Sequence, residues 1–488
     1  MRRSRSGVLA TVIRRRISQQ RSEGVGLRSV RTVTGAVALS VVGALALTGC
    51  GGGSHPAAKR THAPHPTATV SAPPTALTVG LFGTGQEIAA YRQAVDNYDA
   101  AQRSITVTVK TWPTAAAMMK DLAAGQPAPD VFLADRGDLD VLSQDKTIQP
   151  VDDLLAAREV DLGDGYTRES LEAFSADRHL MCMPYSASPR VLYYNTDIID
   201  FPAMKAAGVA TPSDPDSGKW TVQTFAAAVT WADQHPGVRA FSTPSTIEDL
   251  APYLYSGQGE VVDNEQTPTT LAFSDPSNDD TWTKILPVLS TPGAALTPKQ
   301  LKKHTPLQWF ERGKLGMLVG DRSLVPELRK HSDLHWDVIS LPSVAGTSTI
   351  GDYTGLCLSA QTKQTQAAAD LLAYLVSNPA VALVSRAGSI VPVNNAVAAS
   401  DAFLQPTQQP AHAKVFVTNG RSMHVLPIPS ETLATLDGRV GGLISRLFQQ
   451  NAAVPGITGQ IDSASQPIFS ALNASLSPSP TPTATPTD

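Results

Sequence analysis

The chain has 488 residues, with 39 Lys and Arg against 43 Asp and Glu, a net charge of -4 and a hydrophobic content of 42%. This length predicts two or more lobes, because single hydrophobic cores stop growing at about 250–300 residues. The weak negative charge argues against nucleic acid as a partner, which requires a basic face. Three cysteines are too few for a disulfide scaffold or a closed thiolate zinc site.

The N-terminal segment has the pattern of a lipoprotein signal peptide, residues 1–50. An arginine-rich stretch is followed by an apolar run, 33–47, which ends in Leu-Thr-Gly-Cys50, a sequence that resembles the bacterial lipobox. The run is too short for a membrane span of about 20 residues but suits a signal-peptide core. We expect Cys50 to be lipidated and to anchor the protein at the extracellular face of the membrane. A cleaved signal or an anchor helix is the alternative, and the long basic prefix leaves open a downstream translation start.

Two further segments predict no folded structure. Residues 51–76 are Gly, Pro, Ser, Thr and His with almost nothing to bury, and they predict a disordered tether; residues 476–488 predict a disordered tail. The three histidines of the tether lack carboxylate or cysteine partners, and the calcium-like stretch 214–218 lacks the required Gly and distal Glu. We therefore expect neither a metal site nor a cofactor.

Alternating strands and helices after the tether predict an α/β sheet. Strands are expected at 77–82, 105–109 and 128–135, with a helix over 88–101. Gln86, Glu87 and Asp135 then fall near the carboxyl ends of strands, where open α/β sheets bind ligands, and Trp112 follows the second strand. The loop before the helix completes neither GxGxxG nor a P-loop.

The stretch 181–197 is the one around which the chain is organised. Pro184 and Pro189 lie among apolar residues, and a β-rich run, 191–194, ends at the turn formers Asn195 and Asp197. Proline cannot donate to a central strand ladder and restricts the residue before it. We interpret this stretch as strand, break, strand, where the chain leaves one lobe and enters another.

Several segments resemble, in the right order, those of family-1 extracellular solute-binding proteins, the ligand-catching components of bacterial ABC importers. They are LAAGQPAPDVFLAD (122–135), the stretch 184–195, the segment 250–259, WFERGKLGMLVGDR (309–322), the strand 336–342 and the helix 366–377. The fourth departs from the family at its end, where Asp321 and Arg322 replace a common aromatic. The resemblance covers about residues 77–475.

The resemblance implies an α/β, two-lobed fold of the type II periplasmic-binding-protein class, with discontinuous lobes and a hinge. Lobe 1 would comprise 77–187 and 336–392, and lobe 2 would comprise 188–335 and 393–475. Hinge strands are expected near 186–190, 334–337 and 391–394. The implied ligand site lies between the lobes: Gln86, Glu87, Trp112, Asp135, Asp352 and Tyr353 from lobe 1, and Tyr253, Asp321 and Arg322 from lobe 2. For Tyr253, a place in the core of a helix is the alternative.

The function implied is capture of a small solute, in this family mostly a sugar, and its delivery to the permease. Partners would be the transmembrane subunits with their cytoplasmic ATPase, and the protein would act as a lipid-anchored monomer. No GxSxG, HExxH or partnered SxxK motif indicates an enzyme. A lipoprotein of the same fold that reports its ligand to a sensor kinase is the alternative function. The aromatic content of 6% and the position of Arg322 argue against a long oligosaccharide.

Cys182 and Cys357 lie in apolar, strand-like runs that the resemblance assigns to one lobe. Disulfides persist outside the membrane, and with Cys50 lipidated these two would form an even pair. Two free thiols acting as small apolar fillers are the alternative.

Overall fold

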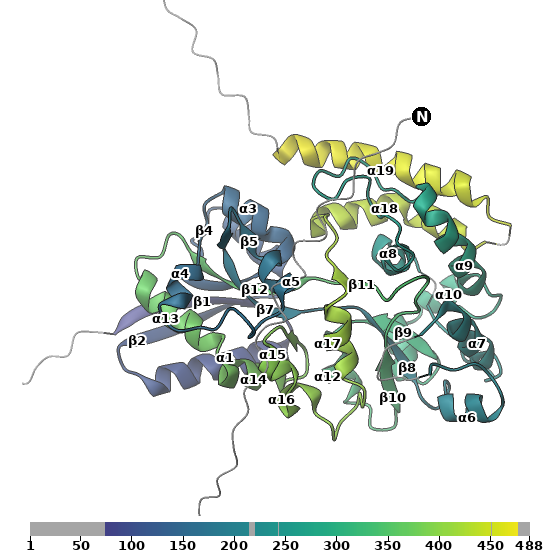
Figure 1. Ribbon diagram of the computed structural model, residues 1–488, viewed down its shortest axis with the longest axis horizontal. Helices are drawn as coiled ribbons and strands as arrows, with labels where there is room; N and C mark the ends of the chain where they lie inside the picture. Colours follow the sequence, from purple (N-terminus) through teal and green to yellow (C-terminus); the bar gives the residue numbers. More distant parts are fainter. Residues whose placement is uncertain (1–73, 214–219, 243, 450, 477–488) are drawn as a thin grey trace, which may run out of the picture. The chain divides into compact units, whose positions relative to one another are not determined.

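The computed structural model describes residues 74–213, 220–242, 244–449 and 451–476. The predicted signal peptide with Cys50, the predicted tether up to residue 73, the calcium-like stretch and the predicted tail from 477 lie outside the described residues. The described residues build two lobes, each with its own sheet and core (Figure 1).

Lobe 1 is built on a seven-stranded sheet. The strand order is β13-β7-β12-β3-β1-β2, and β4 pairs with β12. The strands are β1 (Thr75–Phe82), β2 (Ile105–Trp112), β3 (Val131–Asp135), β4 (Ile148–Gln149), β7 (Cys182–Ala187), β12 (Tyr353–Ser359) and β13 (Val391–Pro392). β1 pairs in parallel with β2 and β3, whereas β12 runs antiparallel to β3 and β7. A small hairpin, β5 (Ser175–Ala176) with β6 (His179–Leu180), lies outside this sheet.

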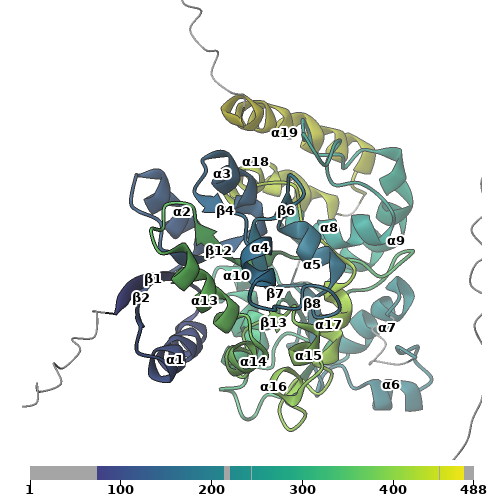
Figure 2. The same cartoon turned by 60° about the vertical axis from the view of Figure 1, so that its left-hand side comes forward.

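Helices cover this sheet with faces that follow the helical period. α1 (Gly85–Ala101) buries Tyr91, Ala94, Val95 and Tyr98, and its N-cap Thr84 accepts a hydrogen bond from the Glu87 amide, 3.3 Å. α1 packs against α13 and α14, as Figure 2 shows. The helices of the lobe are α2 (Ala115–Ala123), η2 (Arg136–Asp138), α3 (Leu139–Gln144), α4 (Asp152–Ala156), α5 (Arg168–Ala173), α13 (Thr365–Leu375), α14 (Asn378–Ser385) and α15 (Asn395–Ala398).

Lobe 2 has a three-stranded antiparallel sheet, β10-β8-β9, made of β8 (Val191–Asn195), β9 (Met317–Gly320) and β10 (Trp336–Ile339). Both faces of this sheet are buried, because alternate side chains of β8 enter different apolar clusters. Leu192 and Tyr194 belong to one cluster, and Val191 and Tyr193 belong to the other. Buried positions on both faces explain why the run 191–194 is apolar throughout.

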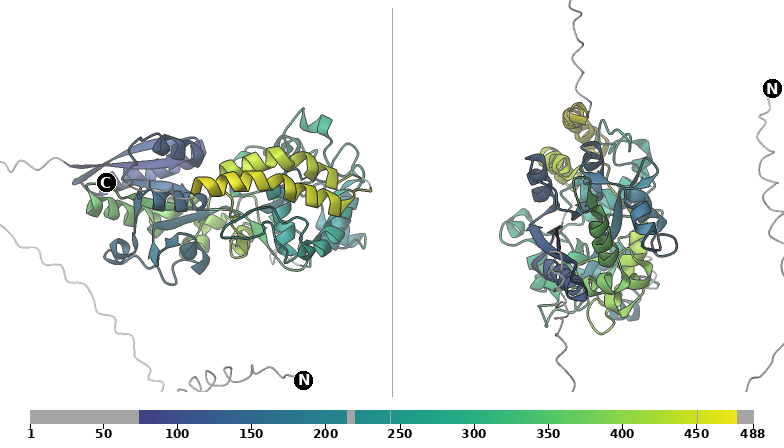
Figure 3. Two further views of the ribbon diagram at one scale, coloured as in Figure 1. Left: turned by 90° about the horizontal axis from the view of Figure 1, so that it is seen from above. Right: turned by 90° about the vertical axis from the view of Figure 1, so that its left-hand side faces the viewer.

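The remaining helices surround this sheet. They are α6 (Phe201–Ala206), α7 (Val222–Ala232), α8 (Ile247–Ser256), η4 (Pro276–Asn278), α9 (Asp279–Leu289), α10 (Pro298–Leu301), α11 (Pro306–Glu311), η5 (Arg322–Leu324), α12 (Val325–Leu328), α16 (Asp401–Leu404), α17 (Lys414–Gly420), α18 (Ser430–Leu447) and α19 (Val454–Leu476). α18 and α19 pack against each other, yellow in Figure 3, and bury Leu436, Val440, Ile461 and Phe469 in the core of lobe 2.

The crossing segments between the lobes are hydrogen-bonded to one another. Ser188 and Arg190 donate their amides to the carbonyls of Asp352 and Ile350, both at 2.9 Å. Beyond them, β11 (Thr349–Ile350) pairs in parallel with β14 (Met423–His424). A Cβ at Gly351 would lie 2.4 Å from the Ser188 carbonyl oxygen and 2.4 Å from the Met423 sulfur, so only glycine fits this crossing.

Two predicted boundaries need correction. The predicted return to lobe 1 at residue 336 is wrong, since β10 pairs with β8 in lobe 2; the chain returns at 350–353, not at Leu334–Asp337. Val393 and Val397 pack in the core of lobe 1, so residues from 393 do not all belong to lobe 2. The predicted order of strand, break and strand is confirmed, with the break at residues 188–190 between β7 and β8; Pro184 lies inside β7, opposite Gly355 and beside an irregularity in the ladder.

Cys182 and Cys357 are joined by a disulfide, with their Cα atoms 4.2 Å apart. The two residues face each other on the adjacent strands β7 and β12, in the core of lobe 1. Of the two alternatives left open by the sequence, the structure has the bridge.

Within the described residues, no single helix is long and apolar enough to span a membrane. Among the described helices, the bent pair α13 and α14, with an angle of 57°, has the length and composition for a span when taken together, and both helices contribute to the core of lobe 1.

Candidate functional site

The carboxyl ends of β1 and β3 bring acidic side chains together, as the sequence predicts. Glu87 lies in the first turn of α1, directly after β1, and Asp135 is the last residue of β3. A Cβ at Gly83 would lie 2.7 Å from a Glu87 carboxylate oxygen, so the side chain folds back over this glycine. Asp135 accepts a hydrogen bond from the Thr354 hydroxyl of β12, 3.0 Å.

Asp352, at the crossing that precedes β12, adds a further carboxylate. Its Oδ1 accepts a hydrogen bond from the Tyr353 amide, 2.8 Å, and its backbone is bonded to Ser188 of the first crossing. Burial, with the neighbouring carboxylates of Asp135 and Asp138, raises the pKa of Asp352 to about 8. Because its backbone is bonded to Ser188, Asp352 lies where the two lobes are connected.

The other carboxylates of lobe 1 also have raised pKa values. Burial raises the pKa of Asp135 to about 6, although the Thr354 hydroxyl opposes the shift. Burial and the neighbouring Asp135 raise the pKa of Asp138, in η2, to about 6. Groups that change protonation between pH 6 and 8 can either accept or donate a hydrogen bond near neutral pH.

Lobe 2 contributes Asp321 to the same group. Burial, with contributions from the carboxylates of Asp321 and Asp135, raises the pKa of Glu87 to about 7, against a hydrogen bond with the Thr84 backbone. Asp321 follows β9 and caps η5 by accepting the Ser323 amide, 2.8 Å. We call Glu87, Asp135, Asp138, Asp321 and Asp352 the carboxylate cluster. It contains groups from both lobes.

The side chains of three predicted residues of lobe 1 make other contacts or face solvent, and Tyr353 meets the cluster through its backbone amide, which donates to Asp352. The indole of Trp112 donates to Asp121 in its own lobe, 2.7 Å, and remains half-buried. Tyr353 is buried and its hydroxyl donates to the Gly420 carbonyl, 3.3 Å. Gln86 is exposed in the first turn of α1.

Two predicted residues of lobe 2 belong to its interior instead. Tyr253, on α8, is 4% exposed and packs in the core, which is the alternative considered for it. Arg322 is 1% exposed, and it donates to the carbonyls of Gly388 and Phe403, both at 3.0 Å. Its guanidinium lies 4.5 Å from the Phe403 ring centroid and 5.2 Å from that of Phe416. Arg322 therefore has a structural role in place of the expected ligand contact, because its side chain points into the protein interior and bonds to backbone carbonyls there.

Sequence reasoning missed Asp138. The residue follows Asp135 by three positions, so one turn of η2 brings both carboxylates to the same side of the strand end. An acidic pair with this spacing after a buried strand was the available signal.

The comparisons with known proteins agree with this architecture. Residues 93–413 match the family model described as bacterial extracellular solute-binding protein. A search of the curated proteins found no match. Among solved structures, the sugar-binding protein MalE from Xanthomonas citri is 16% identical and has a TM-score of 0.67, covering 83% of this chain and 100% of its own.

Two other solved structures have similar scores. An ABC substrate-binding protein from Listeria monocytogenes, in complex with cycloalternan, is 17% identical at a TM-score of 0.66, covering 82% of this chain and 99% of its own. The cyclic alpha-maltosyl-1,6-maltose binding protein from Arthrobacter globiformis is 16% identical at a TM-score of 0.64, covering 82% and 100%. The two-lobed periplasmic-binding-protein-like fold is thus shared along nearly the whole length of these proteins. With more than half of its residues matched to the family model, the chain belongs to the bacterial extracellular solute-binding proteins.

Proposed function

We propose that this protein captures a sugar between its two lobes and delivers it to the transmembrane subunits of an ABC importer with a cytoplasmic ATPase. The observation that carries the proposal is the carboxylate cluster, to which lobe 1 contributes Glu87 and Asp135 and lobe 2 contributes Asp321. A ligand that contacts both sides binds the arrangement in which the lobes are close better than the arrangement in which they are apart. Only this difference in affinity shifts the balance between the two arrangements.

The chemistry of the cluster suits a compound rich in hydroxyl groups. Ionised carboxylates accept hydrogen bonds from hydroxyls, and protonated carboxyls also donate one. The similar structures of a protein in complex with cycloalternan and of a cyclic alpha-maltosyl-1,6-maltose binding protein support a carbohydrate ligand.

The size of the sugar is proposed to be small. Sugar rings stack on exposed aromatic faces, but Tyr253 and Tyr353 are both buried. Trp112 is half-buried and lies at the end of β2. A short or acidic sugar needs fewer aromatic platforms than a long oligosaccharide.

The protein is also proposed to be anchored to the membrane by a lipid at its N-terminus. The Leu-Thr-Gly-Cys50 sequence supports lipidation of Cys50, which would keep the binding lobes near the importer at the extracellular face of the membrane. We propose a monomer, since each chain carries both halves of the candidate site.

A thermal-shift screen tests the function. The purified protein is heated with maltose, maltotriose, cycloalternan, monosaccharides and sugar acids, and with amino acids and polyamines as non-sugar classes. A saccharide should raise the melting temperature as its concentration rises, because it binds only the folded state. Asp135→Asn should reduce the shift, whereas Asp140→Asn, exposed on α3, should not. A shift with polyamines or amino acids alone would refute the sugar, and no shift with any compound would refute the binding role.

A further inference from the structure

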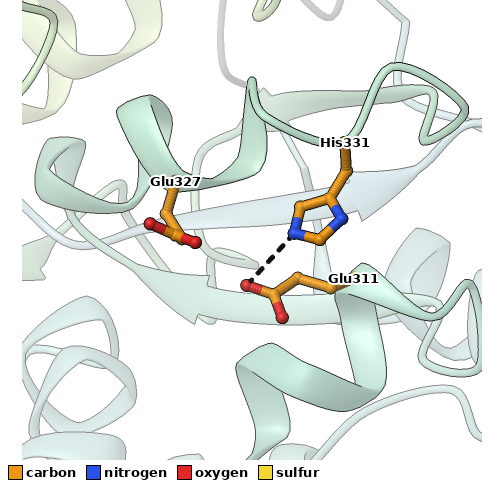
Figure 4. Close-up of side chains that lie close together, drawn as sticks. All are labelled: Glu311, Glu327 and His331. Carbon is orange, nitrogen blue, oxygen red and sulfur yellow. Dashed lines mark ion pairs between the residues drawn. The ribbon is translucent and has the colours of Figure 1, made fainter.

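Three metal-ligating side chains meet on lobe 2, away from the carboxylate cluster. Glu311 ends α11, Glu327 lies on α12, and His331 follows α12. One ligand atom of each lies within 4.8 Å of the other two, and Figure 4 shows all three side chains directed toward one point. We propose that Glu311, Glu327 and His331 bind a divalent transition metal ion, for which Zn²⁺ is the reference case.

The distances fit a metal of this size. The ligands of a tetrahedral zinc ion lie about 2.0–2.2 Å from the metal, which places them about 3.3–3.6 Å from each other. The Nε2 atom of His331 and the Oε1 atom of Glu311 are 3.7 Å apart. This separation is too long for a hydrogen bond, but it leaves room for an ion between the two atoms. Small rotations of the Glu327 side chain would complete the set.

The donor set also selects the class of metal. One imidazole with two carboxylates suits zinc and related first-row ions, whereas magnesium and calcium prefer oxygen ligands alone. Three protein ligands leave a fourth position for water, as in open zinc sites. Glu327 lies in α12, and in the turn that follows this helix the His331 amide donates to the Leu328 carbonyl, 3.1 Å, which brings His331 back beside Glu327.

The surroundings give an ion access to the site. A pocket of about 490 Å³ is lined by Glu311 and His331 together with Asp197 and Asp333. The side chains of Glu311, His331 and Glu327 are 15%, 40% and 47% exposed, so Glu311 is the fixed member and the others reach toward it. Lys330 pairs with Glu327, but this pair is exposed and such pairs contribute little to stability. A bound ion would replace it and would tie α11 to α12.

The sequence did not predict this site. Its donors come from α11, from α12 and from the turn after α12, and β9 separates the two helices in sequence, so the only local signal was the spacing of Glu327 and His331.

Calorimetric titration with Zn²⁺ tests the proposal. The full chain carries His55, His62 and His65 in its N-terminal part, so all measurements use a background with these three replaced by alanine. This background should bind one Zn²⁺ per chain, and bound Co²⁺ should give the visible absorption of a low-coordinate site. His331→Ala and Glu311→Gln should each weaken binding at least about tenfold, because loss of even an outer-shell partner costs this much.

His179→Ala is the matched control. His179 is an exposed histidine that also pairs with one carboxylate, Asp152, at 2.9 Å, and its loss should leave the metal affinity unchanged. Melting of each variant without metal verifies folding, and the half-exposed position of His331 makes its variant decisive should Glu311→Gln unfold. Absence of saturable binding in the background protein, or unchanged binding in His331→Ala, would overturn the proposal.

Discussion

The two lobes use their charged residues in opposite ways. Lobe 1 places Asp135, Asp138 and Asp352 at one end of its sheet, where partial burial raises their pKa values. Lobe 2 directs Arg322 inward, against two phenylalanine rings, whereas the neighbouring Asp321 acts electrostatically on Glu87 of lobe 1. Adjacent residues of one motif, Asp321 and Arg322, can therefore have unrelated roles.

The lobes also differ in how they are held together. Lobe 1 has a disulfide between adjacent strands of a seven-stranded sheet. Lobe 2 has a three-stranded sheet whose side chains make aromatic contacts. The ring centroids of Tyr193 and Trp336 are 5.5 Å apart, and those of Tyr194 and Phe201 are 5.0 Å apart. The comparison predicts that reduction of the disulfide destabilises lobe 1 directly, whereas lobe 2 depends on packing alone.

The largest effect is expected from the disulfide. Because the bridge closes a long loop, with 175 residues of sequence separation, removing it by Cys182→Ala with Cys357→Ala should lower the free energy of unfolding by about 2–4 kcal/mol. Urea unfolding, with and without reductant, measures this. Peptide mapping of the denatured, unreduced protein should find neither cysteine as a free thiol. Two free thiols at these positions would contradict the structure.

Arg322→Met tests the structural role of the guanidinium in lobe 2. It removes the two hydrogen bonds to the carbonyls of Gly388 and Phe403, and hydrogen bonds to charged groups contribute about 1.5–3 kcal/mol. We therefore expect the free energy of unfolding to fall by about 2–3 kcal/mol. Asp321→Asn is the control, since asparagine caps a helix as well as aspartate does. Unchanged stability with lost ligand binding in Arg322→Met would instead support the sequence-based ligand contact.

Gly351→Ala tests the crossing between the lobes. The added methyl group would overlap the Ser188 carbonyl and the Met423 sulfur, so stability should fall by about 1–3 kcal/mol, as for other overpacked sites. Gly346→Ala is the matched control, because a Cβ there meets nothing within 4 Å. Equal melting temperatures for the two variants would show that the crossing segments are not packed as described.

The pH dependence of stability tests the carboxylate cluster. In the folded protein the pKa of Asp352 is about 8, above its ordinary value of 3.8, so the folded state binds more protons than the unfolded state between these values. Stability from this group is fully present below about pH 4 and is lost as the pH rises toward 8. The unfolding free energy of the unmodified protein should change between about pH 4 and pH 8. In Asp352→Asn this change should be smaller by at least about 1 kcal/mol. An unchanged slope would contradict the raised pKa.

Much of the fold could be predicted from the sequence because its signals are local. The expected helix over 88–101 corresponds to α1, and the expected strands at 77–82 and 105–109 correspond to β1 and β2. The crossing after Pro189 was also predictable, since proline chemistry and the apolar run beyond it both act on neighbouring residues. The assignment of β10 failed because strand pairing depends on residues that are distant in sequence.

The site was predictable in part for the same reason. Asp135 follows a buried strand and Glu87 opens a helix after another, and both positions are fixed by local structure. The inward direction of the Arg322 side chain depends on Gly388 and Phe403, which lie 66 and 81 positions further along the chain. No residue near Arg322 in the sequence indicates this direction. Tyr253 has the helical spacing of a core residue, which a single sequence does not distinguish from a ligand-facing one.

Affinity measurements on a pair of variants test most directly whether one ligand is held by both lobes. The saccharide with the largest thermal shift is titrated by calorimetry into the unmodified protein, Asp135→Asn and Asp321→Asn. Loss of a charged hydrogen-bonding partner should weaken binding about tenfold or more in each variant, because the proposed site has carboxylates of both lobes in contact with the sugar. Unchanged affinity in Asp321→Asn, with or without an effect of Asp135→Asn, would contradict a site shared between the lobes.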